Sequence, residues 1–356
     1  MHSDAHDLTA GRVPEAPWPR RRVLAALALP TLPLIAQPAR DATAIARLLA
    51  ERYTVNAPLG YVGALIGSAQ RRIGGALPAR SQQTMAALRQ AAATTPPADW
   101  PLRAGYAALA EAARFDGDTV AGDLAREAVR SAIVDTPAGP RLKGLRAWTD
   151  DLFMPVLLLD RTLPLLPDIE RQRATEALGA SLLDLAAKLQ RPDGLFDHAE
   201  GSPIAWGRGN GFAGLALALA LAGTVPPTSP AGAPLLARLK RHLRALLPLQ
   251  APDGLWRQVL DQPQSSGELT VTAMTLTALA LARRFGWLPA GPADAAITRA
   301  WAGVQAHVDA DGDFSDVCAG TPAGSTLDFY LQRPIVNGRD DRAAAMVLWA
   351  ALHLPP

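Results

Sequence analysis

A short turn motif recurs along the chain at a nearly constant interval. Residues 189–196 read LQRPDGLF and residues 249–256 read LQAPDGLW, an offset of 60 residues. A weaker third copy, DGDF, begins at Asp311, 58 residues after Asp253. Proline presets φ and glycine supplies positive φ, so Pro-Asp-Gly is turn chemistry. A period of this length is typical of helical arrays, in which each repeat is one supersecondary unit.

The three turns lie between stretches whose apolar residues are spaced by three and four, as in amphipathic helices. These stretches are about 169–190, 234–250 and 293–308 before the turns, and 211–221, 268–285 and 339–354 after them. Segments 100–114 and 119–133 also read as helices, and 41–97 is expected to supply the first hairpin or two. Alanine and leucine are abundant and are strong helix formers. The sequence therefore predicts an all-α protein, in which six hairpins close into an (α/α)6 barrel. An open superhelix is the alternative.

The segment 223–234 is rich in Pro, Gly, Ser and Thr, but it separates two halves of a repeat. Residues 41–356 are therefore expected to form a single catalytic domain. Arg20 to Arg22 precede an apolar run over 23–36, which is typical of a twin-arginine export signal. Pro19 stands where Ser or Thr is usual, and no clean cleavage site follows. Residues 1–40 are expected to be an export signal on a periplasmic or secreted protein. The alternative is a disordered tail on a cytoplasmic one.

Several classes of function are disfavoured by composition. The net charge of +2 lacks the clustered basic face of a nucleic-acid binder. No apolar stretch reaches the roughly 18 residues that suggest a spanning helix. Cys318 is the single cysteine, and the six histidines lack metal-ligand spacing. Phosphate-binding and zinc-hydrolase motifs are missing as well. No cofactor and no metal are expected, and the sequence does not indicate the oligomeric state.

Two helix starts carry unusual polar groups. At 148–154 the chain reads WTDDLFM, which places Asp150 and Asp151 side by side. One Asp often caps a helix, but one cap suffices, so the second carboxylate is available for chemistry. Between 196 and 212, His198 and Arg208 lie among glycines and aromatics. Arginine is the favoured planar clamp for a carboxylate. The alternative for Arg208 is a purely structural pair with Asp150 or Glu200.

Two further helix starts complete the pattern. Residues 265–274 read SSGELTVTAM, and capping explains part of that polarity around Glu268. Residues 328–341 bring Tyr330 and Arg333 close to the start of the last helix. If the repeats close into a ring, all four junctions lie at one rim. Loops on a rigid scaffold are where functional sites usually lie.

These four segments together resemble glycoside hydrolase family 105, the unsaturated rhamnogalacturonyl hydrolases, and the related family 88. The matching motifs are W-x-D-D-L-F-M at 148–154, H-x-x-x-S-P-x-x-W-x-R-G-N-G at 198–211, E-x-T-x-T-A-M at 268–274 and Y-x-x-x-P-I-V at 330–336. The resemblance runs from about residue 99 to the C-terminus. It implies an (α/α)6 barrel, which agrees with the repeat pattern.

The resemblance also implies a reaction on an oligosaccharide whose terminal uronic acid carries a C4=C5 double bond left by a lyase. An acid protonates C4 of the vinyl ether, and water adds at C5. The resulting hemiketal opens and releases the rest of the sugar. One aspartate can serve first as acid and then as base, so the two-carboxylate spacing rules of ordinary glycosidases do not apply.

Carried over by motif, the resemblance assigns catalysis to Asp150 and substrate contacts to His198, Trp206 and Arg208. Trp148 belongs to the same motif as Asp150 and is expected to contact the sugar. Partial burial or a neighbouring carboxylate would raise the pKa of Asp150 toward neutrality.

Three further positions complete the expected site. Glu268, in the third motif, is expected to bind substrate. Phe212 stands where the family often has tryptophan; it keeps a stacking face but lacks the indole donor. The family also has an upstream aspartate that faces the catalytic one. Asp99 is the best match by distance, although its context, Ala98-Asp99-Trp100, matches poorly.

Two other functions compete with this hypothesis. The first is a different activity on the same barrel, such as an ordinary glucuronidase or a polysaccharide lyase. The second is a non-catalytic sugar-binding or scaffold protein that kept the fold, because fold alone never proves function. The joint presence of Asp150, His198 and Arg208 argues against the second.

Overall fold

The computed structural model describes residues 41–54, 60–74, 79–94 and 99–354. Ala39–Pro356 forms one compact unit. The export signal or tail expected over residues 1–40 lies outside the described residues. Among the helices that are described, none is both long and apolar enough to cross a membrane.

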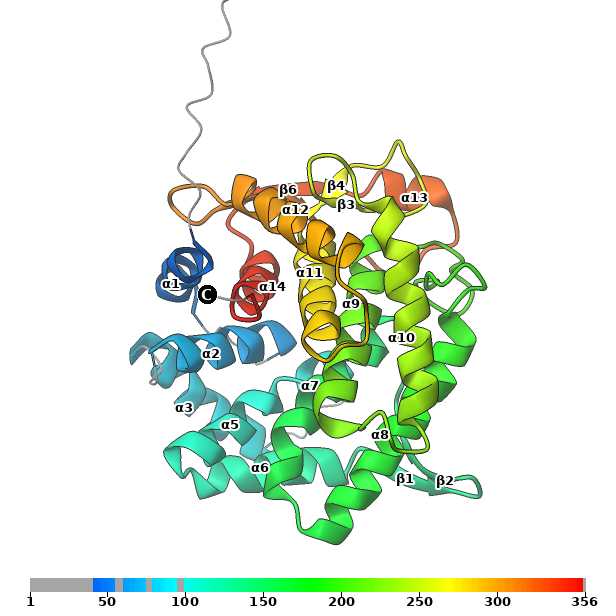
Figure 1. Ribbon diagram of the computed structural model, residues 1–356. Coiled ribbons are helices and arrows are strands. Elements are labelled where there is room, and N and C mark those ends of the chain that lie inside the picture. The colour runs from blue at the N-terminus through cyan, green and yellow to red at the C-terminus, as the bar shows by residue number, and fades with distance from the viewer. Residues whose placement is uncertain (1–40, 55–59, 75–78, 95–98, 355–356) are drawn as a thin grey trace, which may run out of the picture. The chain divides into compact units, whose positions relative to one another are not determined.

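Six helices form a closed inner ring. Each contacts the next one along the chain, and the last contacts the first, so the ring has no free edge. In Figure 1 these helices surround the centre of the unit. They are α2 (Tyr61–Gly74), α5 (Tyr106–Asp116), α7 (Asp150–Thr162), α9 (Gly207–Leu219), α11 (Leu269–Arg284) and α14 (Asp341–Ala351).

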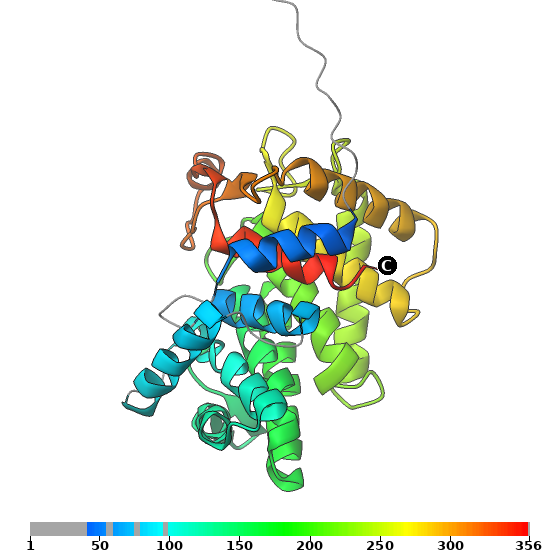
Figure 2. The same ribbon diagram turned by 90° about the vertical axis from the view of Figure 1, so that its left-hand side faces the viewer.

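An outer helix precedes each inner helix along the chain. The first outer helix, α1, precedes α2 and also packs beside the last inner helix, α14, at the point where the ring closes (Figure 2). The outer helices are α1 (Ala42–Arg52), α3 (Ala79–Thr94), α6 (Thr119–Arg130), α8 (Asp168–Leu189), α10 (Gly232–Leu246) and α12 (Pro292–Ala306). This alternation confirms the (α/α)6 barrel and excludes the open superhelix.

The inner and outer helices differ in how much of their surface is buried. Every residue of α9 from Gly207 to Ala218 is buried, as expected for a helix surrounded on all sides. In α10 the buried leucines are Leu235, Leu239, Leu243 and Leu246, spaced by three and four. That spacing gives α10 one apolar stripe toward the ring and a polar face toward water.

Short elements occupy the connections. The helical ones are α4 (Trp100–Arg103), α13 (Leu327–Leu331), two 3-10 turns (Leu163–Leu165 and Leu247–Leu249) and a π turn (Ala220–Thr224). Three antiparallel strand pairs are present in the described part: β1 (Ile133–Thr136) with β2 (Gly139–Leu142), β3 (Trp256–Arg257) with β4 (Gly267–Glu268), and β5 (Phe314–Cys318) with β6 (Ile335–Gly338).

The repeated turns have the conformation that their sequence predicts. Gly194 and Gly254 have φ of 97° and 90°, in the region that favours glycine. The preceding aspartates accept hydrogen bonds from the backbone N–H two residues on, at 3.0 Å for Asp193 and 2.9 Å for Asp253. A Cβ at Gly254 would approach the Arg299 carbonyl to 2.1 Å. The turns therefore fit closely against the next outer helix.

Two expected helices are shorter or interrupted. The stretch 100–114 divides into α4 and α5 at Ala104-Gly105, where glycine weakens helix formation. The expected helix over 119–133 ends at Arg130, and Ile133 begins the β1–β2 hairpin that packs on α8. The periodic pattern did not separate this hairpin from the preceding helix.

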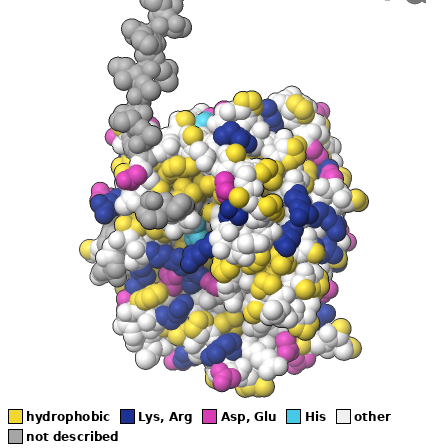
Figure 3. All heavy atoms as spheres, in the orientation of Figure 1, with side chains coloured by type: hydrophobic (Ala, Val, Ile, Leu, Met, Phe, Trp, Pro, Cys, Tyr) yellow, Lys and Arg dark blue, Asp and Glu magenta, His cyan; other side chains and the backbone are white. Residues whose placement is uncertain are grey.

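The inner helices all run in the same direction, so the ring has two distinct ends. The loops that precede α7, α9, α11 and α14 gather at the N-terminal rim with the short strands (Figure 2). Figure 3 shows the opposite face, where the inner helices end.

Candidate active site

The two carboxylates at the start of α7 have different roles. Asp151 is fully buried and accepts hydrogen bonds from the backbone N–H groups of Arg146 (2.6 Å) and Trp148 (3.2 Å). It thereby holds the turn at Ala147, whose φ is 57°. Asp150 retains 22% exposure of its side chain. Asp151 therefore holds the loop that precedes α7, whereas the side chain of Asp150 stays partly exposed.

The surroundings of Asp150 favour its protonated form. Burial, assisted by the charge of Asp151, raises the pKa of Asp150 to about 6. The guanidinium groups of Arg146 and Arg208 oppose this shift without cancelling it. A carboxyl group with this pKa exchanges a proton near neutral pH, as a general acid must.

His198 lies directly beside Asp150. Its Nε2 is 3.8 Å from Asp150 Oδ2, and its Nδ1 is 2.5 Å from the hydroxyl of Tyr330. Burial lowers the pKa of His198 to about 3, so the imidazole is neutral near pH 7. Nε2 is buried and has no hydrogen-bond partner among the described residues. A buried polar atom without a partner is unusual and here faces the carboxyl group of Asp150.

Tyr330 connects His198 to the last rim loop. Its hydroxyl accepts from the Gly324 N–H (3.0 Å) and lies 2.8 Å from Ser202 Oγ. The Ser202 hydroxyl in turn donates to the Gly324 carbonyl. These bonds fix the hydroxyl that faces His198. Sequence reasoning placed Tyr330 in a motif but did not count it among the site residues.

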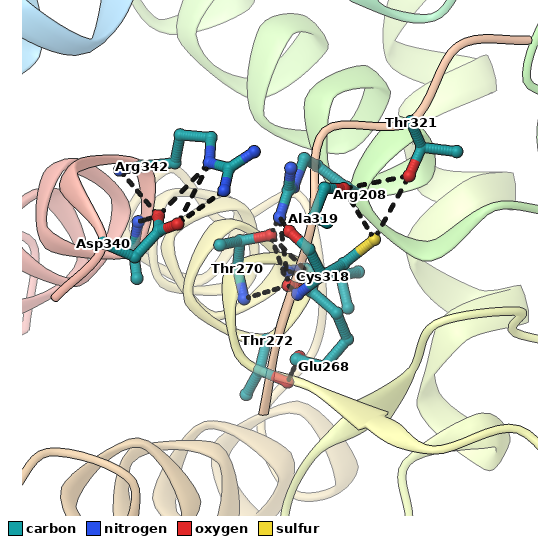
Figure 4. Close-up of polar contacts among 11 residues, drawn as sticks. Arg208, Glu268, Thr270, Thr272, Cys318, Ala319, Thr321, Asp340 and Arg342 are labelled. Atoms are coloured by element: carbon teal, nitrogen blue, oxygen red, sulfur yellow. Dashed lines mark hydrogen bonds and ion pairs between the residues drawn. The ribbon is translucent and has the colours of Figure 1, made fainter. Parts of the chain in front are cut away.

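Arg208 is buried at the start of α9 and is held by three groups (Figure 4). Its Nε donates to Thr270 Oγ1 (2.8 Å), and its Nη2 reaches Glu268 Oε1 (3.5 Å) and the Cys318 carbonyl. Burial is the largest single effect and opposes the positive charge, but Glu268, Cys318, Tyr61 and Asp340 together outweigh it and keep the pKa of Arg208 above its ordinary value. These bonds use Nε and Nη2 and leave Nη1 for other contacts.

Glu268 is occupied by protein donors. Its carboxylate caps α11 by accepting from Thr270 N (3.1 Å) and Val271 N (2.7 Å), and it also accepts from Cys318 N (3.1 Å). This geometry makes Glu268 a positioning residue for Arg208. The structural pair considered for Arg208 was assigned to the wrong carboxylate, since Glu200 is exposed and lies 3.7 Å from Lys188 instead.

The aromatic residues of the candidate site form two groups, one packed around His198 and one buried deeper in the barrel. Trp206 packs against His198 with ring centroids 4.3 Å apart, and Trp148 meets the same histidine edge-on at 5.4 Å. The guanidinium of Arg146 lies 4.5 Å above the Trp148 ring. Phe212 lies deeper, stacked on Phe153 at 5.3 Å and almost fully buried. Phe153 covers one face of its ring and Tyr61 packs nearly perpendicular to it at 5.8 Å, so the buried Phe212 ring has no exposed face on which a sugar could stack.

Asp99 lies at the rim without a contact to Asp150 among the described residues. Its carboxylate caps α4 by accepting from Leu102 N (3.0 Å). The carboxylate that raises the pKa of Asp150 is Asp151. The catalytic role expected for Asp99 stays a prediction.

A cavity of about 520 Å³ opens at the rim between α2, α4 and α14. Tyr61, Leu102, Asp340 and Arg342 are among the residues that line it. Burial raises the pKa of Tyr61 to about 12, and Arg208 and Asp150 also act on that hydroxyl. Tyr61 therefore lies between the cavity and the Asp150 region. Sequence reasoning missed it because 41–97 carries no recognisable motif.

The sequence profile of Glycosyl Hydrolase Family 88 matches residues 141–355, which is more than half of the chain. The chain belongs to this family. All four rim motifs lie within the matched region. The resemblance drawn from those motifs is thereby confirmed.

Relatives in other organisms agree with the assignment. Over 133 residues the chain is 32% identical to the unsaturated rhamnogalacturonyl hydrolase YesR of Bacillus subtilis, covering 37% of this chain and 36% of that protein. The chain thus matches about a third of that relative's length.

Two solved structures share the fold. One is a possible member of family 105 from Klebsiella pneumoniae, with a TM-score of 0.75 and 19% identity over 93% of this chain and 98% of that one. The other is the unsaturated glucuronyl hydrolase of Bacillus sp. GL1, with a TM-score of 0.62 and 15% identity over 88% of this chain and 94% of that one.

Among the described residues, no group of three or more His, Cys, Asp and Glu side chains could hold a metal ion.

Proposed function

We propose that this family 88 hydrolase removes a terminal Δ4,5-unsaturated uronic acid from pectin-type oligosaccharides left by a lyase. Asp150 donates a proton to C4 of the vinyl ether. Water then adds at C5, and the hemiketal opens to release the remaining sugar. The observation that carries this proposal is a single proton-exchanging carboxyl group, Asp150, beside a neutral histidine at the rim.

The environment of Asp150 suits both halves of the reaction. Its raised pKa keeps a useful fraction protonated near pH 6, so it can act as the acid. After transfer it is a carboxylate, which can accept a proton from the attacking water. His198 Nε2, 3.8 Å from Asp150 Oδ2, can hold that water or a sugar hydroxyl.

The charge of the substrate has a matching group. The uronate is an anion, and Arg208 is a cation fixed by Glu268, Thr270 and the Cys318 carbonyl. A guanidinium fixed in this way loses little conformational freedom when an anion binds its remaining nitrogen. YesR, the relative described above, is named for its action on unsaturated rhamnogalacturonyl substrates, which supports a pectin-type oligosaccharide.

The test is the ultraviolet absorbance of the vinyl ether. Purified wild type and Asp150→Asn are each incubated with an unsaturated galacturonyl disaccharide and with its saturated counterpart. We expect absorbance to fall with the wild type alone, and the saturated sugar to stay intact. Cleavage of the saturated sugar would indicate an ordinary glucuronidase, and a rise in absorbance on a polymer would indicate a lyase. If neither unsaturated galacturonyl nor unsaturated glucuronyl substrates react, the result would favour a non-catalytic sugar-binding protein.

We also propose export by the twin-arginine route, supported by Arg20 to Arg22 and the apolar run that follows them. Fusing residues 1–40 to a reporter should send it out of the cytoplasm. The same fusion with Arg21 and Arg22 replaced by lysine should stay inside. Equal export of both fusions would contradict the proposal.

A further inference from the structure

A second cavity lies at the opposite end of the barrel. It has a volume of about 190 Å³ and is surrounded by the C-terminal ends of α2, α7, α9, α11 and α14. Arg72, Arg161, Arg284, Trp349 and His353 line it. Figure 3 shows this face, on which basic side chains gather around a histidine. None of these residues belongs to the rim site.

Arg161 is the buried member of this group. Its Nε donates to Glu111 Oε1 (2.8 Å), and its Nη1 pairs with Asp160. Its Nη2 is buried and has no hydrogen-bond acceptor among the described residues. The side chain is only 7% exposed, so bulk water does not replace that missing acceptor. A buried guanidinium nitrogen with no acceptor costs free energy that a ligand could recover.

Two exposed arginines add charge around the same cavity. Neither Arg72 nor Arg284 forms an ion pair within the described part of the chain. Arg72 lies 4.6 Å above the Trp349 ring and Arg161 lies 5.2 Å from it, so the indole fixes the two guanidinium groups. Among the lining residues, three arginines face one carboxylate, that of Asp160. Glu111, which pairs with Arg161, is a second carboxylate next to this group, and the net positive charge that remains favours an anion.

His353 contributes a further polar atom. Its Nδ1–H donates to the Trp349 carbonyl at 2.7 Å, which leaves Nε2 for another partner. Burial, together with Arg72, Arg161 and Arg284, lowers the pKa of His353, in agreement with three cations gathered around it.

Arginines at helix C-termini have an ordinary explanation, because cations stabilise the negative end of the helix dipole. That explanation accounts for Arg72 and Arg284. It does not account for Arg161, which is buried with one nitrogen unsatisfied and lines a cavity.

We propose that this cavity binds a small tetrahedral oxyanion, of the phosphate or sulfate type, between Arg72 and Arg284 and beside the buried guanidinium of Arg161. The volume equals roughly six waters, which accommodates one such anion with part of its hydration shell. Binding joins the ends of several inner helices and stabilises the ring. The site is independent of the proposed reaction at the rim.

The test is a titration of the full-length protein with inorganic phosphate at constant ionic strength, followed by thermal unfolding and calorimetry. Phosphate also stabilises proteins generally by exclusion from their surface, so variants must separate the two effects. Arg72→Gln and Arg284→Gln remove exposed lining charges. Arg244→Gln removes the same charge from the exposed end of α10 and serves as the control. Arg161 is left unchanged because Glu111 would otherwise lose its buried partner.

We expect a saturable rise in Tm and saturable heat for the wild type and Arg244→Gln. In Arg72→Gln and Arg284→Gln, we expect the affinity to fall at least tenfold. A rise that never saturates, or one that is equal in all four proteins, would overturn the proposal. Sulfate and a sugar phosphate form the other arms of the titration. Equal affinities would indicate a free oxyanion, and tighter binding of the sugar phosphate would indicate the phosphate group of a larger ligand.

Discussion

The two ends of the barrel each contain a buried arginine beside a buried glutamate, but the pairs are built differently. At the rim, the carboxylate of Glu268 accepts hydrogen bonds from the backbone of α11 and of Cys318. Nη2 of Arg208 lies 3.5 Å from Glu268 Oε1. At the opposite end, Arg161 contacts Glu111 at 2.8 Å, and that carboxylate also accepts from Ser68. At the rim, protein donors occupy the carboxylate of Glu268. In the other pair, Nη2 of Arg161 has no hydrogen-bond acceptor among the described residues.

Helix α7 connects the two ends and shows which physical effect dominates at each. Asp150 begins the helix, where the dipole favours a negative charge by about 0.3–1 kcal/mol. Its pKa nevertheless rises from 3.8 to about 6, which corresponds to roughly 3 kcal/mol in the opposite direction. Burial therefore outweighs the dipole at the rim. At the far end of α7, Arg161 pairs with both Asp160 and Glu111.

The largest expected effect comes from changing the acid at each end of α7. Asp150→Asn should reduce kcat at least about 1000-fold, because a general acid contributes roughly 10²–10⁴. Asp160→Asn, the matched change near the other end, should keep kcat within about threefold of the wild type, because it contacts no rim residue. Both are measured by loss of vinyl-ether absorbance.

The stability of Asp150→Asn provides its control. Since the folded pKa of Asp150 is raised, its ionised form opposes folding above pH 6, and this cost vanishes below pH 4. The Asn variant should therefore gain up to about 3 kcal/mol at pH 8 and nothing at pH 3.5. A variant that is inactive but destabilised at pH 8 would point to misfolding instead.

The pH dependence of the reaction is the next largest effect. About half of Asp150 is protonated at pH 6 and about 1% at pH 8, so kcat/KM should fall roughly 50-fold between these pH values. Asp160→Asn should keep the same profile, since its carboxylate lies at the other end of the helix. A decline that begins near pH 4 would mean that burial does not raise the pKa of Asp150.

Much of the barrel could be predicted because its turns are determined by short sequence motifs. Pro-Asp-Gly at 192–194 and 252–254 forms the turns that follow α8 and α10, and the positive φ of each glycine is expected from the motif itself. The ring closure and the rim followed from the period. The hairpin at 133–142 was missed because its strands are only four residues long and adjoin a helix.

Individual site roles were harder to predict because they depend on contacts between distant segments. Glu268 reads as a substrate ligand from its motif, yet five protein donors, some of them far along the chain, occupy its carboxylate. Tyr61 is 89 positions before Asp150 in the sequence, and only the folded barrel brings its hydroxyl close enough to be influenced by that carboxylate. No local sequence pattern indicates which distant residues come together in the fold.

Conservative changes to the two buried arginines should separate binding from stability. Lysine keeps the charge but loses the planar fork, so Arg208→Lys and Arg161→Lys should each cost about 1–3 kcal/mol of unfolding free energy. Only Arg208→Lys should also lower kcat/KM, by about 10- to 100-fold, since a charge-assisted hydrogen bond to the uronate is lost. Urea unfolding and steady-state kinetics measure both quantities. Equal kinetic losses in the two variants would mean that Arg208 acts through the fold alone.

The smallest expected effect concerns the contact behind His198. Tyr330→Phe removes the hydroxyl that lies 2.5 Å from His198 Nδ1, so the imidazole facing Asp150 loses its anchor. We expect kcat to fall about three- to tenfold with KM little changed, consistent with the roughly 1 kcal/mol of one hydrogen bond. Ser202→Ala is the matched control, because it removes a partner of the same hydroxyl and of Gly324 without touching His198. If both variants lose kcat equally, Tyr330 acts by holding the Gly324 loop. If only Tyr330→Phe does, the reaction at the rim depends on a histidine fixed by a side chain, whereas His353 at the arginine end is fixed by the backbone carbonyl of Trp349.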